Sequence, residues 1–192
     1  MARPKEFDKQ ATLSKAVDAF WERGFVGTSV QQLVDTMGIH RASLYDTYGS
    51  KQELFREAMD LYSRRVQALA ERALDRPGPS SRVLDEFFMD TVRELCAPDT
   101  KGCLMVRTVF SGMDDVPGAR ERVVKHMQET RRLFHDVLRR GQVAGEVGAG
   151  ANLEDLSDFL VTLYEGVVVN AAIERDARRL ERTVRAALAV LA

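Results

Sequence analysis

The stretch from Gly27 to Phe55, GTSVQQLVDTMGIHRASLYDTYGSKQELF, constrains the fold of this chain more than any other segment. Apolar residues follow Thr28 at helical spacing until Gly38, and a second, shorter helical pattern ends at Gly49. A glycine at a helix end adopts the left-handed backbone that a tight turn requires. The stretch therefore predicts a helix, a tight turn and a short second helix, a layout typical of helix-turn-helix DNA recognition.

Capping patterns mark where these helices begin. Thr28 and Gln31 form a T-x-x-Q pattern, in which the hydroxyl caps the helix and the glutamine reaches back. Ser50 and Glu53 form the equivalent S-x-x-E pattern at the start of a long third helix. The short helix between them is expected over residues 40–48, with Leu44 and Tyr48 on one face and packed inward.

The rest of the chain also has helical periodicity, and no strand pattern competes with it. We expect an all-α fold of about nine helices, with a three-helix helix-turn-helix domain over residues 1–50 and a larger helical domain over residues 51–192. The expected helices cover about residues 7–23, 28–37, 40–48, 51–75, 82–96, 103–111, 117–143, a segment starting after Asn152, and 177–191. The helix from residue 51 is long enough to connect the two domains. Helical spacing predicts that Leu69 faces the core in this helix and that Met127 does so in the helix over residues 117–143.

Composition places the chain among ordinary globular proteins, with 192 residues and 45% hydrophobic residues. The N-terminal segment MARPKEFDK is polar and lacks an apolar signal core, and no apolar run is long enough to span a bilayer. We therefore expect a cytoplasmic protein with no membrane partner.

Bulk charge does not identify a nucleic-acid partner. The formal net charge is −1, and the first 60 residues contain eight basic and nine acidic side chains. DNA binding is thus predicted from the motif rather than from electrostatics. Local placement still favours it, because Arg3, Lys5 and Lys9 form a basic N-terminal group while Arg41 and Lys51 flank the short helix.

These residues resemble the TetR (tetracycline-repressor) family of transcription regulators. The shared pattern lies in Gly24 to Val30, Gly38, Ser43-Leu44-Tyr45, Gly49-Ser50-Lys51 and Glu53-Leu54-Phe55, with a weaker echo at KGCLMV further along. The resemblance implies a homodimer that binds a pseudo-palindromic operator in double-stranded DNA and is released by a small-molecule effector. A repressor is expected over an activator, although the sequence does not separate the two.

The expected DNA contacts come from the helix-turn-helix residues and the start of the following helix. The predicted DNA-binding residues are Thr28, Ser29, Gln31, Arg41, Ala42, Ser43, Tyr45, Thr47 and Lys51. Arg41 is the candidate for a base contact, because its guanidinium matches the acceptors of guanine, with a phosphate contact or a solvated charge as the alternatives. His40 stands where the family commonly has a serine cap, and Asp46 places a carboxylate near phosphate; both depart from the family pattern.

The helix after Asn152 is apolar almost all round, ending in the run Val167-Val168-Val169. Such a helix must be buried on several sides, and only the last helix follows it. In the family that the chain resembles, these two helices form a four-helix dimer interface. The alternative is a helix at the centre of a monomeric bundle.

The resemblance places an effector site in the second domain. The candidate lining residues are Phe87, Phe88, Thr91, Cys103, Met105, Arg107, Phe110, Met127, Thr130, Phe134 and Tyr164, and ordinary core packing is the alternative for most of them. Cys103 opens a predicted helix, so a thiol-based redox or electrophile sensor is an alternative function, with a small buried cysteine as its plainer interpretation. Arg107 stands where the family often has asparagine.

Other chemistry has little support in the sequence. His126 and His135 are nine residues apart on one predicted helix, which is not a metal-ligand spacing. Nucleophile, phosphate-binding and dinucleotide-binding motifs do not occur. We expect no metal, no cofactor and no catalysis, and we keep a helical enzyme or a structural dimer module as the rival class.

Overall fold

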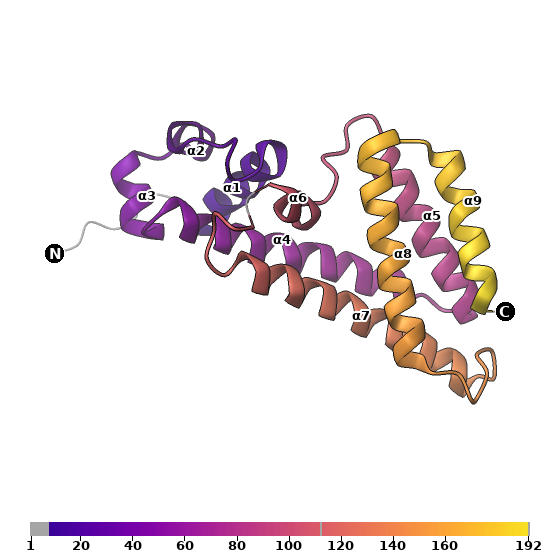
Figure 1. The fold of residues 1–192 in the computed structure, drawn as a ribbon. Helices are drawn as coiled ribbons and strands as arrows, with labels where there is room; N and C mark the ends of the chain where they lie inside the picture. Colours follow the sequence, from indigo (N-terminus) through magenta and orange to yellow (C-terminus); the bar gives the residue numbers. More distant parts are fainter. Residues whose placement is uncertain (1–7, 112, 192) are drawn as a thin grey trace. The chain divides into compact units, whose positions relative to one another are not determined.

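The computed structural model describes residues 8–111 and 113–191 of the chain. These residues form nine α-helices, a short 3-10 segment and no strand, which confirms the predicted all-α fold (Figure 1). The helices are α1 Lys9–Arg23, α2 Val30–Met37, α3 Arg41–Tyr48, α4 Lys51–Leu74, α5 Ser80–Cys96, α6 Leu104–Phe110, α7 Ala119–Val143, α8 Leu153–Glu174 and α9 Ala177–Leu188.

The chain divides into two compact units, each built from two segments. Unit 1 contains residues 1–64 and 103–124, and unit 2 contains residues 65–102 and 125–192. The helices α4 and α7 contribute residues to both units. The compact units therefore cross the boundary expected at residue 50, because α6 and the first part of α4 pack with the helix-turn-helix segment.

Unit 1 is organised around three phenylalanines. Phe20 of α1 meets Phe55 of α4 edge to face at 4.8 Å between ring centroids, and Phe25 lies 5.2 Å from Phe55. All three side chains are buried, as are Leu33 of α2 and Leu44 of α3. Edge-to-face ring contacts add to the burial of apolar area, so this cluster fixes α1, α2 and α3 against α4.

A second set of contacts in unit 1 joins the loop before α7 to α4. Arg56 donates to the Pro117 carbonyl oxygen at 3.0 Å, and Arg122 donates to Asp60 Oδ2 at 3.1 Å. The helix α6 packs against α1, where Arg107 lies close to Gly24. The first residues of α7 are thus held on the helix that follows α3.

Unit 2 is a helical bundle in which α5 packs against α8 and α9, and these two helices pack on each other (Figure 1). Its core contains a stacked pair, Phe88 and Phe134, with ring centroids 5.7 Å apart. Phe87 meets Phe134 edge to face at 5.5 Å and lies 6.0 Å from Tyr164. The core therefore combines packed aromatic rings with aliphatic side chains.

The helix α5 begins at Ser80, two residues earlier than the sequence predicted. The N-cap residue Pro79 offers no side-chain hydrogen bond, but the Ser80 N–H donates to Glu146 Oε2 at 2.6 Å. The Ser80 hydroxyl donates to the Val137 carbonyl oxygen at 3.1 Å. A carboxylate 66 residues away thus supplies the cap, which no local pattern can reveal.

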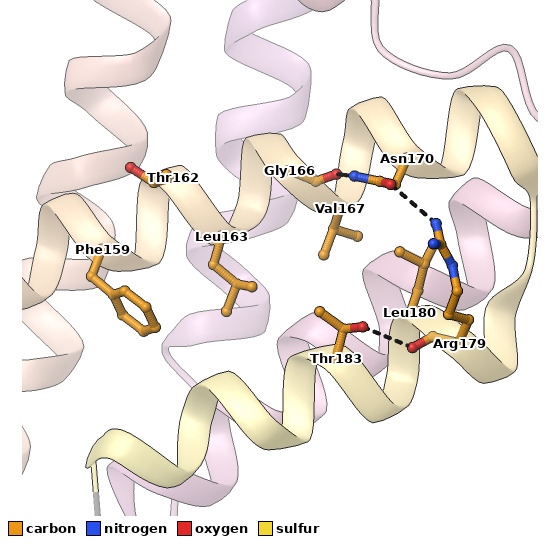
Figure 2. A pocket seen from close by; sticks show the side chains of 9 residues that line it. All are labelled: Phe159, Thr162, Leu163, Gly166, Val167, Asn170, Arg179, Leu180 and Thr183. Atoms are coloured by element: carbon orange, nitrogen blue, oxygen red, sulfur yellow. Dashed lines mark hydrogen bonds between the residues drawn. The ribbon is translucent and has the colours of Figure 1, made fainter.

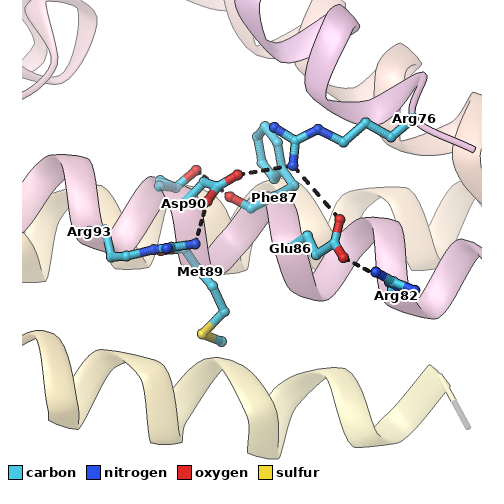
Figure 3. A network of polar contacts seen from close by, with 8 residues as sticks. Arg76, Arg82, Glu86, Phe87, Met89, Asp90 and Arg93 are labelled. Carbon is cyan, nitrogen blue, oxygen red and sulfur yellow. Dashed lines mark hydrogen bonds and ion pairs between the residues drawn. The ribbon is translucent and has the colours of Figure 1, made fainter.

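An exposed ion-pair network ties the α4–α5 turn to α5 (Figure 3). Arg76 pairs with Asp90 at 3.1 Å and lies 3.8 Å from Glu86, which also pairs with Arg82 at 2.8 Å. Arg93 completes the network by pairing with Asp90. Exposed pairs of this kind contribute little stability each, so the network mainly orients the turn.

Two sequence expectations about helix faces need correction. Leu69 was expected to face the core but is 62% exposed, and Met127 is 38% exposed. The α1 helix begins at Lys9, because Asp8 caps it by accepting from the Gln10 N–H at 2.8 Å. The expected start of that helix, at residue 7, lies outside the described residues.

The helix α8 is long and apolar enough to cross a membrane by length and composition, although only 33% of its most apolar window is buried within the chain. The expectation that no apolar run is long enough is therefore wrong by this criterion, which the core helix of a soluble protein also meets. Val167 and Val168 are buried, whereas Thr162, Gly166 and Asn170 form an exposed row. The chain therefore covers one side of α8 and leaves the other side open.

Candidate nucleic-acid interface

The N-cap of α2, the first helix of the recognition pair, lies one residue later than the sequence predicted. Ser29 is its N-cap: Ser29 Oγ accepts the Gln32 N–H at 3.2 Å, and Gln32 Oε1 accepts the Ser29 N–H at 2.8 Å. The predicted capping box of Thr28 with Gln31 is therefore wrong by one position. Gln31 instead donates its side-chain amide to Asp35 Oδ1 at 2.9 Å.

Thr28 lies beneath this helix start rather than on its surface. Its side chain is fully buried, and its hydroxyl donates to the Gly24 carbonyl oxygen at 2.6 Å. A hydroxyl held in this way cannot reach a phosphate, so the side chain of Thr28 is removed from the predicted DNA-binding set. Its role is to fix the start of α2 to the end of α1.

The turn between α2 and α3 is made by Gly38 and Ile39. Gly38 has φ 71° and ψ 35°, and the N–H groups of both residues donate to the Val34 carbonyl oxygen at 2.9 and 3.1 Å. His40 is the N-cap of α3 but makes no side-chain capping bond. The first turn of α3 thus keeps N–H groups without a side-chain cap, and such groups favour an approaching phosphate.

One face of α3 is buried and the opposite face is exposed. Leu44 and Tyr48 are buried in unit 1, as the sequence predicted. The exposed side chains of α3 are Arg41, Ala42, Tyr45 and Asp46. Two more, Ser43 and Thr47, are half-buried. The predicted DNA-binding residues of α3 therefore share the solvent side of the recognition helix.

Tyr48 anchors the end of α3 to the start of α1. Its hydroxyl donates to the Lys9 carbonyl oxygen at 3.2 Å, and the Lys9 ammonium lies 5.2 Å from the centre of its ring. Burial, followed by the charge of Glu57, raises the pKa of Tyr48 to about 12. The sequence indicated that Tyr48 faces inward but gave no sign of this bond, because its acceptor is a backbone atom 39 residues away.

The start of α4 follows α3 after a two-residue turn. Gly49 has φ 79°, and a Cβ on it would lie 2.1 Å from Glu53 Oε2. Ser50 Oγ accepts the Glu53 N–H at 3.1 Å, as the S-x-x-E pattern predicted. The Glu53 carboxylate lies near the Ser50 hydroxyl, at 3.3 Å.

Cations near the recognition helix have different surroundings. Arg41 is exposed and forms no ion pair with any residue that the structure describes. The Lys51 ammonium lies 4.2 Å from the centre of the Phe25 ring, and burial lowers the pKa of Lys51. Lys9 pairs with Glu57 at 3.0 Å, whereas Arg3 and Lys5 of the expected basic group lie outside the described residues.

The residues predicted to line an effector site are divided between the two units. In unit 2, Phe87, Phe88, Thr130 and Phe134 are buried, Thr91 and Tyr164 are half-buried, and Met127 is exposed. In unit 1, Met105 is buried, Cys103 is half-buried, and Arg107 and Phe110 are exposed. Two hollows described in unit 2, one of them between α8 and α9 (Figure 2), are lined by other residues, so the effector site stays a prediction.

A polar cluster in unit 2 accompanies the aromatic residues and was not predicted. Gln67 Nε2 lies 3.2 Å from His126 Nδ1 and donates to the His126 carbonyl oxygen and to Thr130 Oγ1, each at 3.1 Å. Burial lowers the pKa of His126 to about 4. The imidazole is therefore neutral at physiological pH. Within the described residues, no three His, Cys, Asp or Glu side chains gather as metal ligands.

Comparison with known proteins shows which family has this arrangement of helices. Residues 13–58 match the family described as bacterial regulatory proteins, tetR family, and residues 82–187 match the tetracyclin repressor-like C-terminal domain. The chain belongs to the TetR family. The protein is thus a helix-turn-helix transcriptional regulator, as the resemblance in the sequence implied.

Relatives of this TetR-family chain match it along nearly its whole length. It is 30% identical to the uncharacterized HTH-type transcriptional regulator YezE of Bacillus subtilis (strain 168), over 100% of both chains. It is 28% identical to the HTH-type transcriptional repressor ComR of Escherichia coli (strain K12), over 96% of this chain and 88% of ComR. A cysteine mutant of the TetR-family regulator CifR, solved with a 26-base-pair operator, is 31% identical over 100% of both chains, with a TM-score of 0.87.

Proposed function

We propose that this TetR-family chain is a transcriptional repressor that binds a pseudo-palindromic operator as a homodimer and releases it when a small effector binds. The observation that carries the proposal is the exposed face of α3, whose inner face is fixed by Leu44 and Tyr48. The similarity to ComR, a repressor, and to a CifR variant solved on operator DNA supports it.

In this proposal each α3 lies in a major groove and its first turn reads base edges. Arg41 contacts guanine, and Ala42 meets a thymine methyl group. The remaining proposed contacts position the DNA backbone and come from Ser29, Gln31, Ser43, Tyr45, Thr47 and Lys51. Asp46, exposed on the same helix, disfavours phosphate close to it and so narrows the possible docking orientations.

The division of labour follows the two segments of the fold. Residues 1–50 read DNA, while residues 51–192 bind the effector and the second copy. The effector site draws on the aromatic cluster of Phe87, Phe88, Phe134 and Tyr164. The effector binds best to a form of the protein in which α4 is displaced. In that form the two recognition helices no longer match successive major grooves, which are roughly 34 Å apart, and the DNA is released. We expect action in the cytoplasm by binding rather than by catalysis.

Selection of bound sequences from random DNA, repeated with a panel of candidate effectors, tests the proposal. The expected result is an enriched site with two inverted half-sites about one helical turn apart. Anisotropy titrations on that site should then show weaker binding with one effector class. Enrichment of no site, or of single half-sites only, would contradict the proposed dimeric repressor.

A further inference from the structure

The loop between α6 and α7 lies against the first turns of α4, although none of its residues belongs to the predicted DNA-binding set. At its start, Ser111 lies beside Gly24, where an added Cβ would be 3.4 Å from Ser111 Oγ. At its end, the Pro117 carbonyl oxygen accepts a hydrogen bond from Arg56 of α4 at 3.0 Å. Both attachments lie within unit 1. The loop is therefore held between the end of α1 and the start of α4.

Further contacts fix the backbone of the loop where it enters α7. Val116 is buried, and its carbonyl oxygen accepts the Ala119 N–H at 3.0 Å. Arg122 donates to the Gly118 carbonyl oxygen at 3.0 Å and to Asp60 of α4 at 3.1 Å. The exposed side chains of the loop therefore project from a defined position beside α4.

Lys51, the first residue of α4, lies near both attachments of the loop. Its ammonium is 4.2 Å from the centre of the Phe25 ring, and Phe25 directly follows Gly24. Burial lowers the pKa of Lys51, and the negative charge of Asp115 in the loop acts against this effect. Asp115 is exposed and forms no ion pair with any residue that the structure describes. Its charge thus acts on Lys51 across a short distance without locking either side chain.

The neighbouring carboxylates are engaged elsewhere. Glu53 lies 3.5 Å from the Arg56 guanidinium, and Asp114, whose side chain is 97% exposed, lies 3.7 Å from Arg120. Asp115 is therefore the carboxylate whose charge acts on the lysine at the start of α4.

A DNA phosphate that approaches Lys51 meets this carboxylate as a competitor. The Asp115 charge attracts the ammonium and repels the phosphate, and both effects weaken the contact between lysine and DNA. Charges within about 8 Å of each other still interact at physiological ionic strength. Because a phosphate contact carries no sequence information, the weakening applies to every DNA sequence.

We infer that Asp115 limits the DNA affinity of this protein, because its carboxylate competes with DNA phosphate for the Lys51 ammonium. The inference rests on the proposed phosphate contact of Lys51 and adds a residue from outside the helix-turn-helix segment. A lower affinity for random DNA leaves a larger share of the protein free to occupy its operator.

The test is a double-mutant cycle on a fluorescent duplex of scrambled sequence, measured by anisotropy over a series of salt concentrations. Asp115→Asn removes the carboxylate charge. Lys51→Met removes the ammonium and keeps an apolar stem over Phe25. Asp114→Asn is the matched control, because it removes the same charge one residue earlier.

Asp115→Asn should bind the duplex about two- to fivefold more tightly at low salt, and its affinity should fall more steeply with added salt. The control should change the affinity less. In the Lys51→Met background, Asp115→Asn should bring no gain, since the competition needs the ammonium. Both loop positions are exposed, so the variants should keep the wild-type thermal unfolding by circular dichroism. If Asp115→Asn lowers the melting temperature, Asp115→Ser takes its place in the cycle.

The same gain with and without the Lys51 ammonium would show direct repulsion between Asp115 and DNA, and would overturn the inference. An unchanged or weaker affinity of Asp115→Asn would overturn it as well, as would an equal gain from Asp114→Asn. Each of these results leaves the proposed repressor intact. A wild-type protein that binds neither the scrambled duplex nor any selected site would instead overturn the proposed function.

Discussion

The phenolic hydroxyl of Tyr48, at the end of the recognition helix, donates to the backbone of Lys9, the first residue of α1, at 3.2 Å. The Lys9 ammonium lies 5.2 Å from the centre of the Tyr48 ring and pairs with Glu57 of α4. Three helices thus meet at the Lys9 side chain. The hydrogen bond ties the last residue of α3, a helix of only eight residues, to the start of α1.

Replacing Tyr48 with phenylalanine should remove the hydrogen bond and keep the ring. We expect a loss of about 0.5–1.5 kcal/mol in the free energy of unfolding, as for a typical buried hydrogen bond. Chemical denaturation measures the loss, and operator titrations should show weaker specific binding. An unchanged operator affinity in Tyr48→Phe would show that the contact does not orient α3.

The same tyrosine should make stability fall at high pH. Its pKa is raised from 10.0 to about 12, so the folded protein keeps the proton that the unfolded chain releases. The stabilisation is present below pH 10 and is lost as the pH rises towards 12. Chemical denaturation at several pH values across this window gives the free energy of unfolding as a function of pH. Its fall between pH 10 and 12 should be less steep for Tyr48→Phe than for wild type. Equal slopes would show that Tyr48 does not cause the fall.

Arg41 and Lys51 should affect DNA binding differently. Arg41→Ala should lose about 1–3 kcal/mol on the selected operator and relax the choice at one base pair. Lys51→Ala should weaken all sequences alike, and it should also lower the free energy of unfolding by about 0.5–1 kcal/mol because its ammonium lies over Phe25. Titrations on the operator and on scrambled DNA separate the two. Equal losses on both DNAs for both variants would refute this division.

His126 should make the fold less stable in acid. Its pKa is lowered to about 4 by burial, so the unfolded chain binds a proton between pH 6.5 and 4 that the folded chain does not. Stability is fully present above pH 6.5 and falls as the pH drops through this window. The free energy of unfolding should fall less steeply with decreasing pH in His126→Gln than in wild type. The control, His135→Gln on the same helix, should keep the wild-type slope. The same acid slope in both variants would point to carboxylates instead.

Cys103 should react with electrophiles before Cys96 near neutral pH. Burial and then the charge of Asp176 raise the pKa of Cys96, which reduces its thiolate fraction. Cys103 is half-buried at the N-cap of α6. Peptide mapping after partial alkylation measures the order, with Cys96→Ser and Cys103→Ser as controls. Modification of Cys96 first would sink this expectation.

Local patterns predicted the helices well because their causes are local. The glycines at positions 38 and 49, the Ser50 cap and the Asn152 cap all act within a few residues, and each is in place. The T-x-x-Q pattern at Thr28 failed because the next such pair of residues, Ser29 and Gln32, offers the same chemistry one step later. Burial of Thr28 against α1 decided between them, and burial is not a local property.

The sequence predicted the face of α3 but not what fixes it. The helical spacing of Leu44 and Tyr48 is enough to assign the inner and outer sides. Contacts between distant segments, such as Tyr48 with Lys9 or Gln67 with His126, leave no spacing signal. The exposure of Leu69 and Met127 was missed for the same reason, since periodicity gives a face and not what covers it.

The carboxylate of Glu146 that caps Ser80 has a consequence for how the protein is made. A ribosome finishes α5 long before it reaches residue 146, so the newly made helix lacks the acceptor for its first N–H and its first turn frays. The turn after α7 must emerge before the Ser80 N–H gains this acceptor. Synthesis therefore imposes an order in which unit 2 is assembled late, after the Glu146 carboxylate becomes available to cap α5.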